Sequence, residues 1–143
     1  MPNLQDTRRP APRVRVLIAD DHRLYSDTLQ LLLATDDRID VVGRAADGVE
    51  AVELALRFRP DVVLMDVQMP RLDGIVATLT LRRLLPGVRV VMLSSSAAVE
   101  DVECARDAGA CAYLTKDADG GAIRAEVVRA GSAHLPLMDS SAA

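Results

Sequence analysis

Four apolar runs of this chain each lead into polar residues that could handle a phosphoryl group. The run VRVLIA is followed by Asp20 and Asp21, and the run DVVLM is followed by Asp66. The run VRVVML is followed by Ser94, and CAYLT is followed by Lys116. If these runs are neighbouring parallel strands, their polar residues meet at one edge of a sheet, where ligand sites of open α/β sheets lie.

The adjacent carboxylates of Asp20 and Asp21 indicate a cation site. Two neighbouring negative charges in a crevice are costly unless a positive charge offsets them. Mg²⁺ is suited to this place because it binds one or two carboxylates and leaves positions for water and phosphate oxygens. The alternative is a polar turn that caps the following helix, since Asp is a good N-cap residue. The other strand ends favour the metal site.

Asp66 is the candidate nucleophile. A carboxylate at a strand end can attack phosphorus and form an acyl phosphate, while its second oxygen binds the metal ion. The backbone carbonyl of Gln68, two residues later, could be a further metal ligand. The alternative is that Asp66 is only a metal ligand or a helix cap.

Ser94, Lys116 and Tyr113 complete the set of candidate residues. The hydroxyl of Ser94 could donate to a phosphoryl oxygen, although one of the three consecutive serines at 94–96 is also expected to cap the next helix. Lys116 is the only lysine among 17 basic residues. Its compact ammonium can pair with Asp66 before phosphorylation and with phosphate oxygens afterwards. Tyr113 is either a packing residue or a side chain that rotates when the site fills.

The elements that must position these residues alternate between strand and helix. Short β-branched runs predict buried strands at residues 14–19, 39–45, 61–65, 88–93 and 111–114. Helical patterns lie between the strands and after the last one. This alternation predicts the α/β class, with a doubly wound five-stranded parallel sheet of order 2-1-3-4-5 flanked by five helices, as in flavodoxin-like folds.

Several helix details are also predicted. In the first helix, the residues expected to share the buried face are Leu24, Thr28, Leu31 and Leu32. The second helix is expected to open with a capping box at residues 47–50. The last helix is expected to start late or to fray, because two glycines at 120 and 121 weaken its first turn.

Composition narrows the classes of function. Half of the 143 residues are hydrophobic, so the body of the chain is a folded domain, predicted at residues 14–131. A net charge of -4 and an aromatic content of 2% argue against a DNA-binding or base-stacking surface in this segment. No apolar run approaches the roughly 18 residues of a membrane span.

We expect residues 1–13 to be a disordered leader and residues 132–143 a tail or the start of a linker. Cys104 and Cys111 are expected to be small buried hydrophobes.

These motifs resemble the receiver domain of bacterial two-component response regulators. The resemblance covers residues 14–131 and rests on the Asp20-Asp21 doublet and on the segments PDVVLMDVQMPRLDG, VVMLS and AGACAYLTKD. His22 after the doublet and Asp117 after Lys116 are similar to the NarL/LuxR-type subfamily. The resemblance implies a cytoplasmic protein that binds no membrane and is not an enzyme, beyond gaining and losing its own phosphoryl group.

The resemblance implies a role for each candidate. Asp66 is the expected phosphoacceptor, Lys116 the phosphate-binding lysine, Ser94 the switch hydroxyl and Tyr113 the switch aromatic residue. The implied Mg²⁺ ligands are Asp20, Asp21, Asp66 and the backbone carbonyl of Gln68. The implied phosphodonor is a sensor histidine kinase or a small acyl phosphate, and phosphorylation is expected to promote homodimerisation.

Members of this subfamily usually carry a helix-turn-helix DNA-binding domain after the receiver. We therefore expect that DNA binding belongs to an output domain absent from this chain, with a stand-alone receiver that acts through protein contacts as the alternative. A phosphatase of the haloacid dehalogenase type is a weaker alternative, because it needs an acid where Gln68 stands. A flavodoxin-like nucleotide binder lacks support, since no G-x-G-x-x-G motif follows the first strand.

Overall fold

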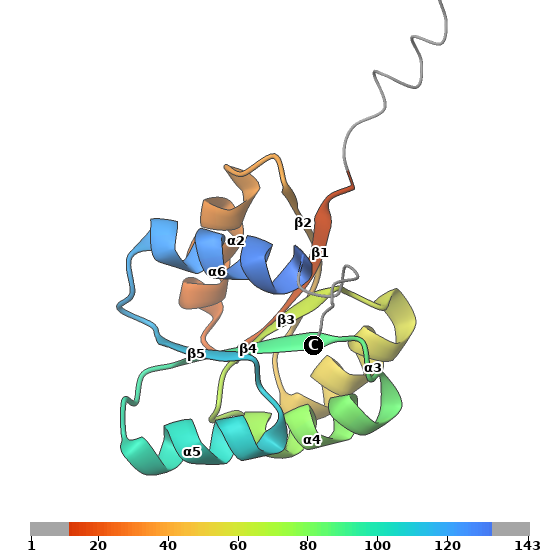
Figure 1. The fold of residues 1–143 in the computed structure, drawn as a ribbon, viewed down its shortest axis with the longest axis vertical. Coiled ribbons are helices and arrows are strands. Elements are labelled where there is room, and N and C mark those ends of the chain that lie inside the picture. Colours follow the sequence, from red (N-terminus) through yellow and green to blue (C-terminus); the bar gives the residue numbers. More distant parts are fainter. Residues whose placement is uncertain (1–11, 133–143) are drawn as a thin grey trace, which may run out of the picture.

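The computed structural model describes residues 12–132, which form five strands and five helices in alternation (Figure 1). The strands are β1 (Val14–Ala19), β2 (Ile39–Ala45), β3 (Val62–Met65), β4 (Arg89–Ser94) and β5 (Ala112–Thr115). The helices are α2 (Arg23–Ala34), α3 (Gly48–Phe58), α4 (Gly74–Leu84), α5 (Val99–Ala108) and α6 (Gly120–Ser132). The predicted strands are confirmed to within one residue at each end.

The strands form one parallel sheet in the order β2-β1-β3-β4-β5, as predicted. Helices α2 and α6 cover one face, and α3, α4 and α5 cover the other (Figure 1). Side chains of β1 alternate between the two cores: Leu17 faces α3 and α4, while Val16 and Ile18 face α2 and α6. Because both faces are covered, the central strands are continuous apolar runs, which explains why the sequence shows them so clearly.

The predicted buried face of the first helix is wrong for Leu24, Thr28 and Leu31, while Leu32 is partly buried against the core. Leu24 and Leu31 of α2 are 79% and 72% exposed, whereas Ser26, Leu29 and Leu33 are buried. The helix has apolar residues on more than one side, so the spacing of its apolar residues is compatible with two different buried faces. In the structure, the face with Leu29 and Leu33 packs against the sheet. In α6, by contrast, the apolar residues Ile123, Val127 and Ala130 share one helical face and are all buried.

Two helix starts were predicted with different outcomes. The capping-box-like start of α3 is confirmed in part: the Asp47 side chain accepts a hydrogen bond from the Glu50 N–H at 2.8 Å, but the Glu50 carboxylate accepts from the Ala46 N–H rather than from the Asp47 N–H. The late start of α6 is wrong, since the helix begins at Gly120. Asp119 offsets the weakness of the glycines: its carboxylate accepts a hydrogen bond from the Gly121 N–H at 2.9 Å.

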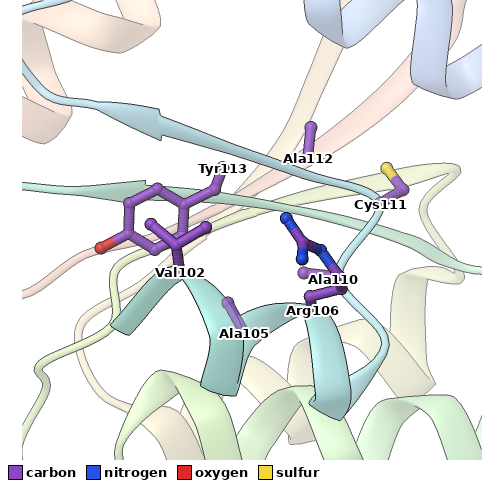
Figure 2. A pocket seen from close by; sticks show the side chains of 7 residues that line it. All are labelled: Val102, Ala105, Arg106, Ala110, Cys111, Ala112 and Tyr113. Carbon is purple, nitrogen blue, oxygen red and sulfur yellow. The ribbon is translucent and has the colours of Figure 1, made fainter. Parts of the chain in front are cut away.

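Helix α5 packs on the sheet through small side chains. Its buried residues are Ala105 and Ala108, and alanine buries little apolar area. A cavity of about 180 Å³ lies between this helix and β5, and its lining includes Val102 and Tyr113 (Figure 2). Few large side chains therefore hold α5 in place.

Three further expectations concern the rest of the chain. Cys104 and Cys111 are exposed, so the prediction that they are buried is wrong. Within residues 12–132, none of the helices has the length and apolar character to cross a membrane. The predicted leader and tail lie almost entirely outside the described residues.

Candidate functional site: an acidic cluster with one lysine

The four strand ends meet at one edge of the sheet, as their order requires. Backbone hydrogen bonds continue the ladder just past the strands: the Asp66 N–H donates to the Ala19 carbonyl at 2.9 Å, and the Lys116 N–H donates to the Ser94 carbonyl at 2.8 Å. The Asp20 N–H likewise donates to the last residue of β2 at 3.0 Å. The sheet therefore fixes the backbone of every strand-end candidate.

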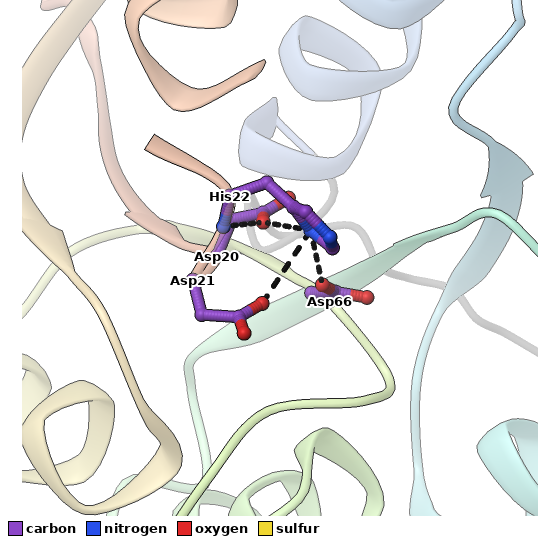
Figure 3. A group of neighbouring side chains, drawn as sticks. All are labelled: Asp20, Asp21, His22 and Asp66. Carbon is purple, nitrogen blue, oxygen red and sulfur yellow. Dashed lines mark hydrogen bonds and ion pairs between the residues drawn. The ribbon is translucent and has the colours of Figure 1, made fainter. Parts of the chain in front are cut away.

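Asp20, Asp21 and Asp66 form an acidic cluster with His22 (Figure 3). Each residue offers one ligand atom, and these atoms lie within 4.8 Å of one another. Asp20 and Asp66 are buried, while Asp21 faces solvent. Three carboxylates form the oxygen-rich donor set that Mg²⁺ prefers. The residues present therefore fit a divalent cation.

Gln68 lies beside this cluster. Its backbone N–H donates to Asp66 Oδ1 at 3.3 Å, and the residue lines the same surface pocket as Asp21 and Asp66. The loop after β3 thus folds back over the phosphoacceptor candidate. This position is compatible with a metal ligand from the Gln68 carbonyl.

Lys116 bridges the two buried carboxylates. Its Nζ lies 2.7 Å from Asp20 Oδ2 and 3.1 Å from Asp66 Oδ2. Burial, together with the charge of Asp20, raises the pKa of Asp66 above its ordinary value although Lys116 opposes the shift. The site therefore holds more negative charge than its single ammonium offsets.

His22 is a site residue that the sequence did not reveal. Its Nδ1 lies 3.2 Å from Asp20 Oδ1, 3.4 Å from Asp21 Oδ1 and 3.7 Å from Asp66 Oδ2. The only signal in the sequence was its position directly after the doublet. His22 is also the N-cap of α2, so the alternative in which the aspartates cap this helix is not supported.

Tyr25 is the second residue that was missed. The Lys116 Nζ lies 4.8 Å from the centroid of its ring, in the range of a cation–π contact. Burial and the charges of Asp20 and Asp66 raise the pKa of the Tyr25 phenol to about 12. Tyr25 therefore remains a neutral aromatic surface behind the ammonium.

Ser94 and Tyr113 meet at a third residue, Ser96. Ser94 is buried at the end of β4, and its Oγ accepts a hydrogen bond from the Ser96 N–H at 3.1 Å. The Tyr113 hydroxyl donates to the Ser96 carbonyl at 2.7 Å. Between residues 12 and 132, no hydrogen bond joins Ser94 directly to Asp66. The two switch candidates are thus linked to each other through one loop.

The expectation that a serine caps α5 is wrong. The N-cap is Ala98, which has no side-chain cap bond. Ser96 lies two residues earlier, and its Oγ accepts a hydrogen bond from the Ala98 N–H at 3.1 Å. The serine therefore organises the loop before the helix rather than its first turn.

The loop that follows Asp66 is held by close backbone contacts. A Cβ atom on Gly74 would lie 2.0 Å from the Asp66 carbonyl oxygen, so only glycine fits there. Arg71 has a left-handed backbone with φ of 68° and pairs with Asp47, the cap of α3. Their hydrogen bonds lower the pKa of Asp47. The loop is thus anchored to a neighbouring helix.

Known proteins are similar to this chain in sequence and in fold. The family model of the response regulator receiver domain matches residues 16–128. The transcriptional regulatory protein LiaR of Bacillus subtilis is 38% identical over 130 residues, which cover 91% of this chain and 61% of LiaR. The transcriptional regulatory protein PdtaR of Mycobacterium tuberculosis is 46% identical over 113 residues, which cover 78% of this chain and 53% of PdtaR.

A solved structure of a receiver domain is also similar to this chain. The signal receiver domain of the putative response regulator NarL from Mycobacterium tuberculosis superposes with a TM-score of 0.83 at 32% identity, over 85% of this chain and 98% of that domain. The chain spans little more than half the length of the curated relatives, 53% of one and 61% of another. The family match covers most of the described residues, and the chain belongs to the response regulator receiver domain family.

Proposed function

We propose that this receiver accepts a phosphoryl group on Asp66 and passes the event on as a change of conformation. The observation that carries the proposal is the Lys116 ammonium, which lies 3.1 Å from Asp66 Oδ2 and 2.7 Å from Asp20 Oδ2 at the carboxyl edge of the sheet. A carboxylate there can act as a nucleophile, and the cation beside it can neutralise arriving phosphate oxygens.

Mg²⁺ is the cofactor that we propose for this site. Asp20, Asp21, Asp66 and the backbone carbonyl of Gln68 would hold it. When bound, the ion neutralises negative charge on the transferring phosphoryl group.

The transfer needs positioning more than covalent help. A carboxylate oxygen of Asp66 forms a bond to phosphorus, while the bond from phosphorus to the donor breaks and the donor leaves with its electron pair. Lys116 binds a phosphate oxygen during the step, having paired with Asp66 before it. The buried position of Asp66 keeps it beside these partners.

Ser94 and Tyr113 are the proposed switch residues. Ser94 would donate its hydroxyl hydrogen to a phosphoryl oxygen, and Tyr113 would follow because both contact Ser96. The face formed by α5, β5 and α6 would then shift. A change in population from 1:99 to 99:1 requires about 5.5 kcal/mol of differential stabilisation.

We propose a sensor histidine kinase as the phosphodonor partner and the cytoplasm as the location, as is general for this family. Phosphorylation is proposed to promote homodimerisation. Light scattering of the protein with and without beryllium fluoride, a phosphoryl mimic, tests this part. An unchanged mass at all protein concentrations would contradict it.

Transcriptional control is a proposal about a longer protein. Several relatives are named transcriptional regulatory proteins, and this chain spans about half of their length. We propose that the receiver controls a helix-turn-helix DNA-binding domain when joined to one. A stand-alone receiver that acts by protein contact is the alternative. The phosphatase alternative loses support, since the whole sheet matches receiver domains.

The central experiment is phosphorylation by acetyl phosphate with Mg²⁺, followed by intact mass measurement. The expected result is the gain of one phosphoryl group by the wild type and none by Asp66→Asn or in the presence of a chelator. Asp73→Asn is a matched control, because Asp73 lies on the same loop but caps α4 instead. A phosphoryl group retained by Asp66→Asn would refute the assignment of Asp66.

A further inference from the structure

The first turn of α5 carries a carboxylate that the proposed switch does not use. Ser96 Oγ donates a hydrogen bond to Asp101 Oδ2 at 2.6 Å. Both residues are half-buried, so water competes only in part for this contact. A hydrogen bond to an ionised acceptor is shorter and stronger than a neutral one. Asp101 therefore fastens the loop after β4 to the helix that follows it.

The same serine contacts both proposed switch residues. The Ser96 N–H donates to Ser94 Oγ at 3.1 Å, and the Ser96 carbonyl accepts from the Tyr113 hydroxyl at 2.7 Å. The three polar groups of Ser96 thus reach Ser94, Tyr113 and Asp101. A displacement of this loop changes all three contacts together.

Helix α5 has few other buried contacts. The hydrogen bond between Ser96 and Asp101 therefore has an important role in holding the helix in place. The helix buries only two alanines, and a cavity of about 180 Å³ separates part of it from β5 (Figure 2). Tyr113 and Val102 both line that cavity. Elements with few buried apolar contacts are the ones that open or shift most easily. A single charged contact at the first turn can therefore set the position of the helix.

We propose that Asp101 is a positioning residue of the switch, which acts through Ser96 to orient Ser94 and Tyr113 and to tie them to α5. The inference rests on the proposed function. Ser94 Oγ accepts its bond from Ser96, which leaves the hydroxyl hydrogen free to donate to a phosphoryl oxygen. Asp101 itself makes none of the described contacts with the acidic cluster.

The chain offers a matched control for this role. Glu100 lies beside Asp101 in the first turn of α5 and is exposed. Within residues 12–132 its side chain makes no hydrogen bond. Glu100→Ala removes the same favourable interaction with the helix N-terminus but leaves the Ser96 contact intact. Asp101→Ala removes both, and Asp101→Asn keeps an acceptor of the same shape without the charge.

The first measurement needs no phosphorylation. The chain has two tyrosines, so protein with isotope-labelled tyrosine gives two sets of ring signals by NMR, which Tyr113→Phe assigns. We expect Asp101→Ala to shift or broaden the Tyr113 signal while the Tyr25 signal is unchanged. Asp101→Asn should have a smaller effect on Tyr113, and Glu100→Ala should have none.

The second measurement is the rate of phosphorylation by acetyl phosphate. Asp101→Ala should lower this rate roughly three- to tenfold, the size expected for the loss of one partly exposed hydrogen bond. Glu100→Ala should leave it near the wild-type value. Circular dichroism checks that each variant is folded, and Asp101→Asn replaces the alanine variant if that one unfolds.

Two results would overturn the inference. One is a Tyr113 signal in the folded Asp101 variants identical to that of the wild type. The other is an equal effect of Asp101→Ala and Glu100→Ala on both measurements. If the wild type gains no phosphoryl group, the proposed function fails, but the tyrosine signals still decide whether Asp101 positions Tyr113.

Discussion

Asp66→Asn should make the metal-free protein more stable than the wild type, although it removes the proposed phosphoacceptor. Asp66 is buried beside Asp20, and burial together with that neighbouring charge raises its pKa. The folded protein therefore disfavours the ionised form of Asp66 even with Lys116 in contact. Asparagine keeps the size and shape of the side chain and removes its charge.

The magnitude follows from the geometry of the cluster. The ligand oxygens of Asp20 and Asp66 lie within 4.8 Å of each other. Two unit charges at that distance repel by about 1 kcal/mol in water and by about 3 kcal/mol at an effective dielectric constant of about 20. The substitution also removes the attraction between Asp66 and Lys116, which offsets part of the stability gained by removing the repulsion. We therefore expect a net increase of about 1–2 kcal/mol in the free energy of unfolding. For a domain of this size the melting temperature should rise by about 4–8 °C.

The pH dependence has a definite sign. Because the pKa of Asp66 is raised by folding, the native state binds its proton more readily than the unfolded chain does. The loss of stability caused by ionised Asp66 is absent below the carboxyl pKa of the unfolded chain, about 3.9. This loss grows as the pH rises through the pKa of Asp66 in the folded protein. The advantage of Asp66→Asn over the wild type should therefore vanish in acid and be full at neutral pH.

Urea unfolding of the wild type, Asp66→Asn and the control Asp40→Asn tests this prediction, first in chelator and then in Mg²⁺. Asp40 is exposed, so its variant should stay within about 0.5 kcal/mol of the wild type. Mg²⁺ at ten times its dissociation constant adds about 1.4 kcal/mol to the wild type and less to a variant that lacks one ligand. An Asp66→Asn protein less stable than the wild type in chelator at neutral pH would refute the argument.

Three further changes test other contacts of the site. Lys116→Arg should slow phosphorylation by acetyl phosphate roughly tenfold or more, because a planar guanidinium cannot take the place of an ammonium that touches two carboxylates; an intact-mass time course at the wild-type rate would contradict this. Gly74→Ala should cost about 1–3 kcal/mol in urea unfolding and slow phosphorylation, since its Cβ would lie 2.0 Å from the Asp66 carbonyl oxygen. Asp47→Ala removes the cap of α3 and the partner of Arg71, and should lower stability by about 1 kcal/mol in thermal unfolding; an unchanged melting temperature would count against the cap.

The sheet was predictable because its central strands β1, β3 and β4 are buried on both faces. Each apolar run is followed by a polar residue, and Asp66 and Lys116 are two of these residues. Parallel order then brings the ends together without any knowledge of side-chain contacts. The placement of the acidic doublet beside these residues follows from the same rule.

The helix faces and the supporting contacts were not predictable in the same way. The first helix has apolar residues at both Leu24 and Leu29, and only the partner surface decides which one is buried. His22 and Tyr25 lie one and four residues past the doublet, yet His22 approaches Asp66, about 40 residues away in sequence, and Tyr25 contacts Lys116, about 90 residues away. A single sequence contains no signal for such long-range contacts.

Several departures from local rules border the candidate site, and one more, the left-handed backbone of Arg59, lies at the end of α3. Asp66 is a buried carboxylate with a raised pKa, Arg71 has a left-handed backbone without being glycine, and Ala98 starts a helix without a side-chain cap. Each is less stable than the local alternative, and each lies on a loop that borders the acidic cluster or leads from β4 to α5. Local strain and missing caps are typical of functional sites. The segment between β4 and α5 is held by the hydrogen bonds of Ser96 rather than by a capped and well-packed helix start, so a new phosphoryl group nearby can displace it.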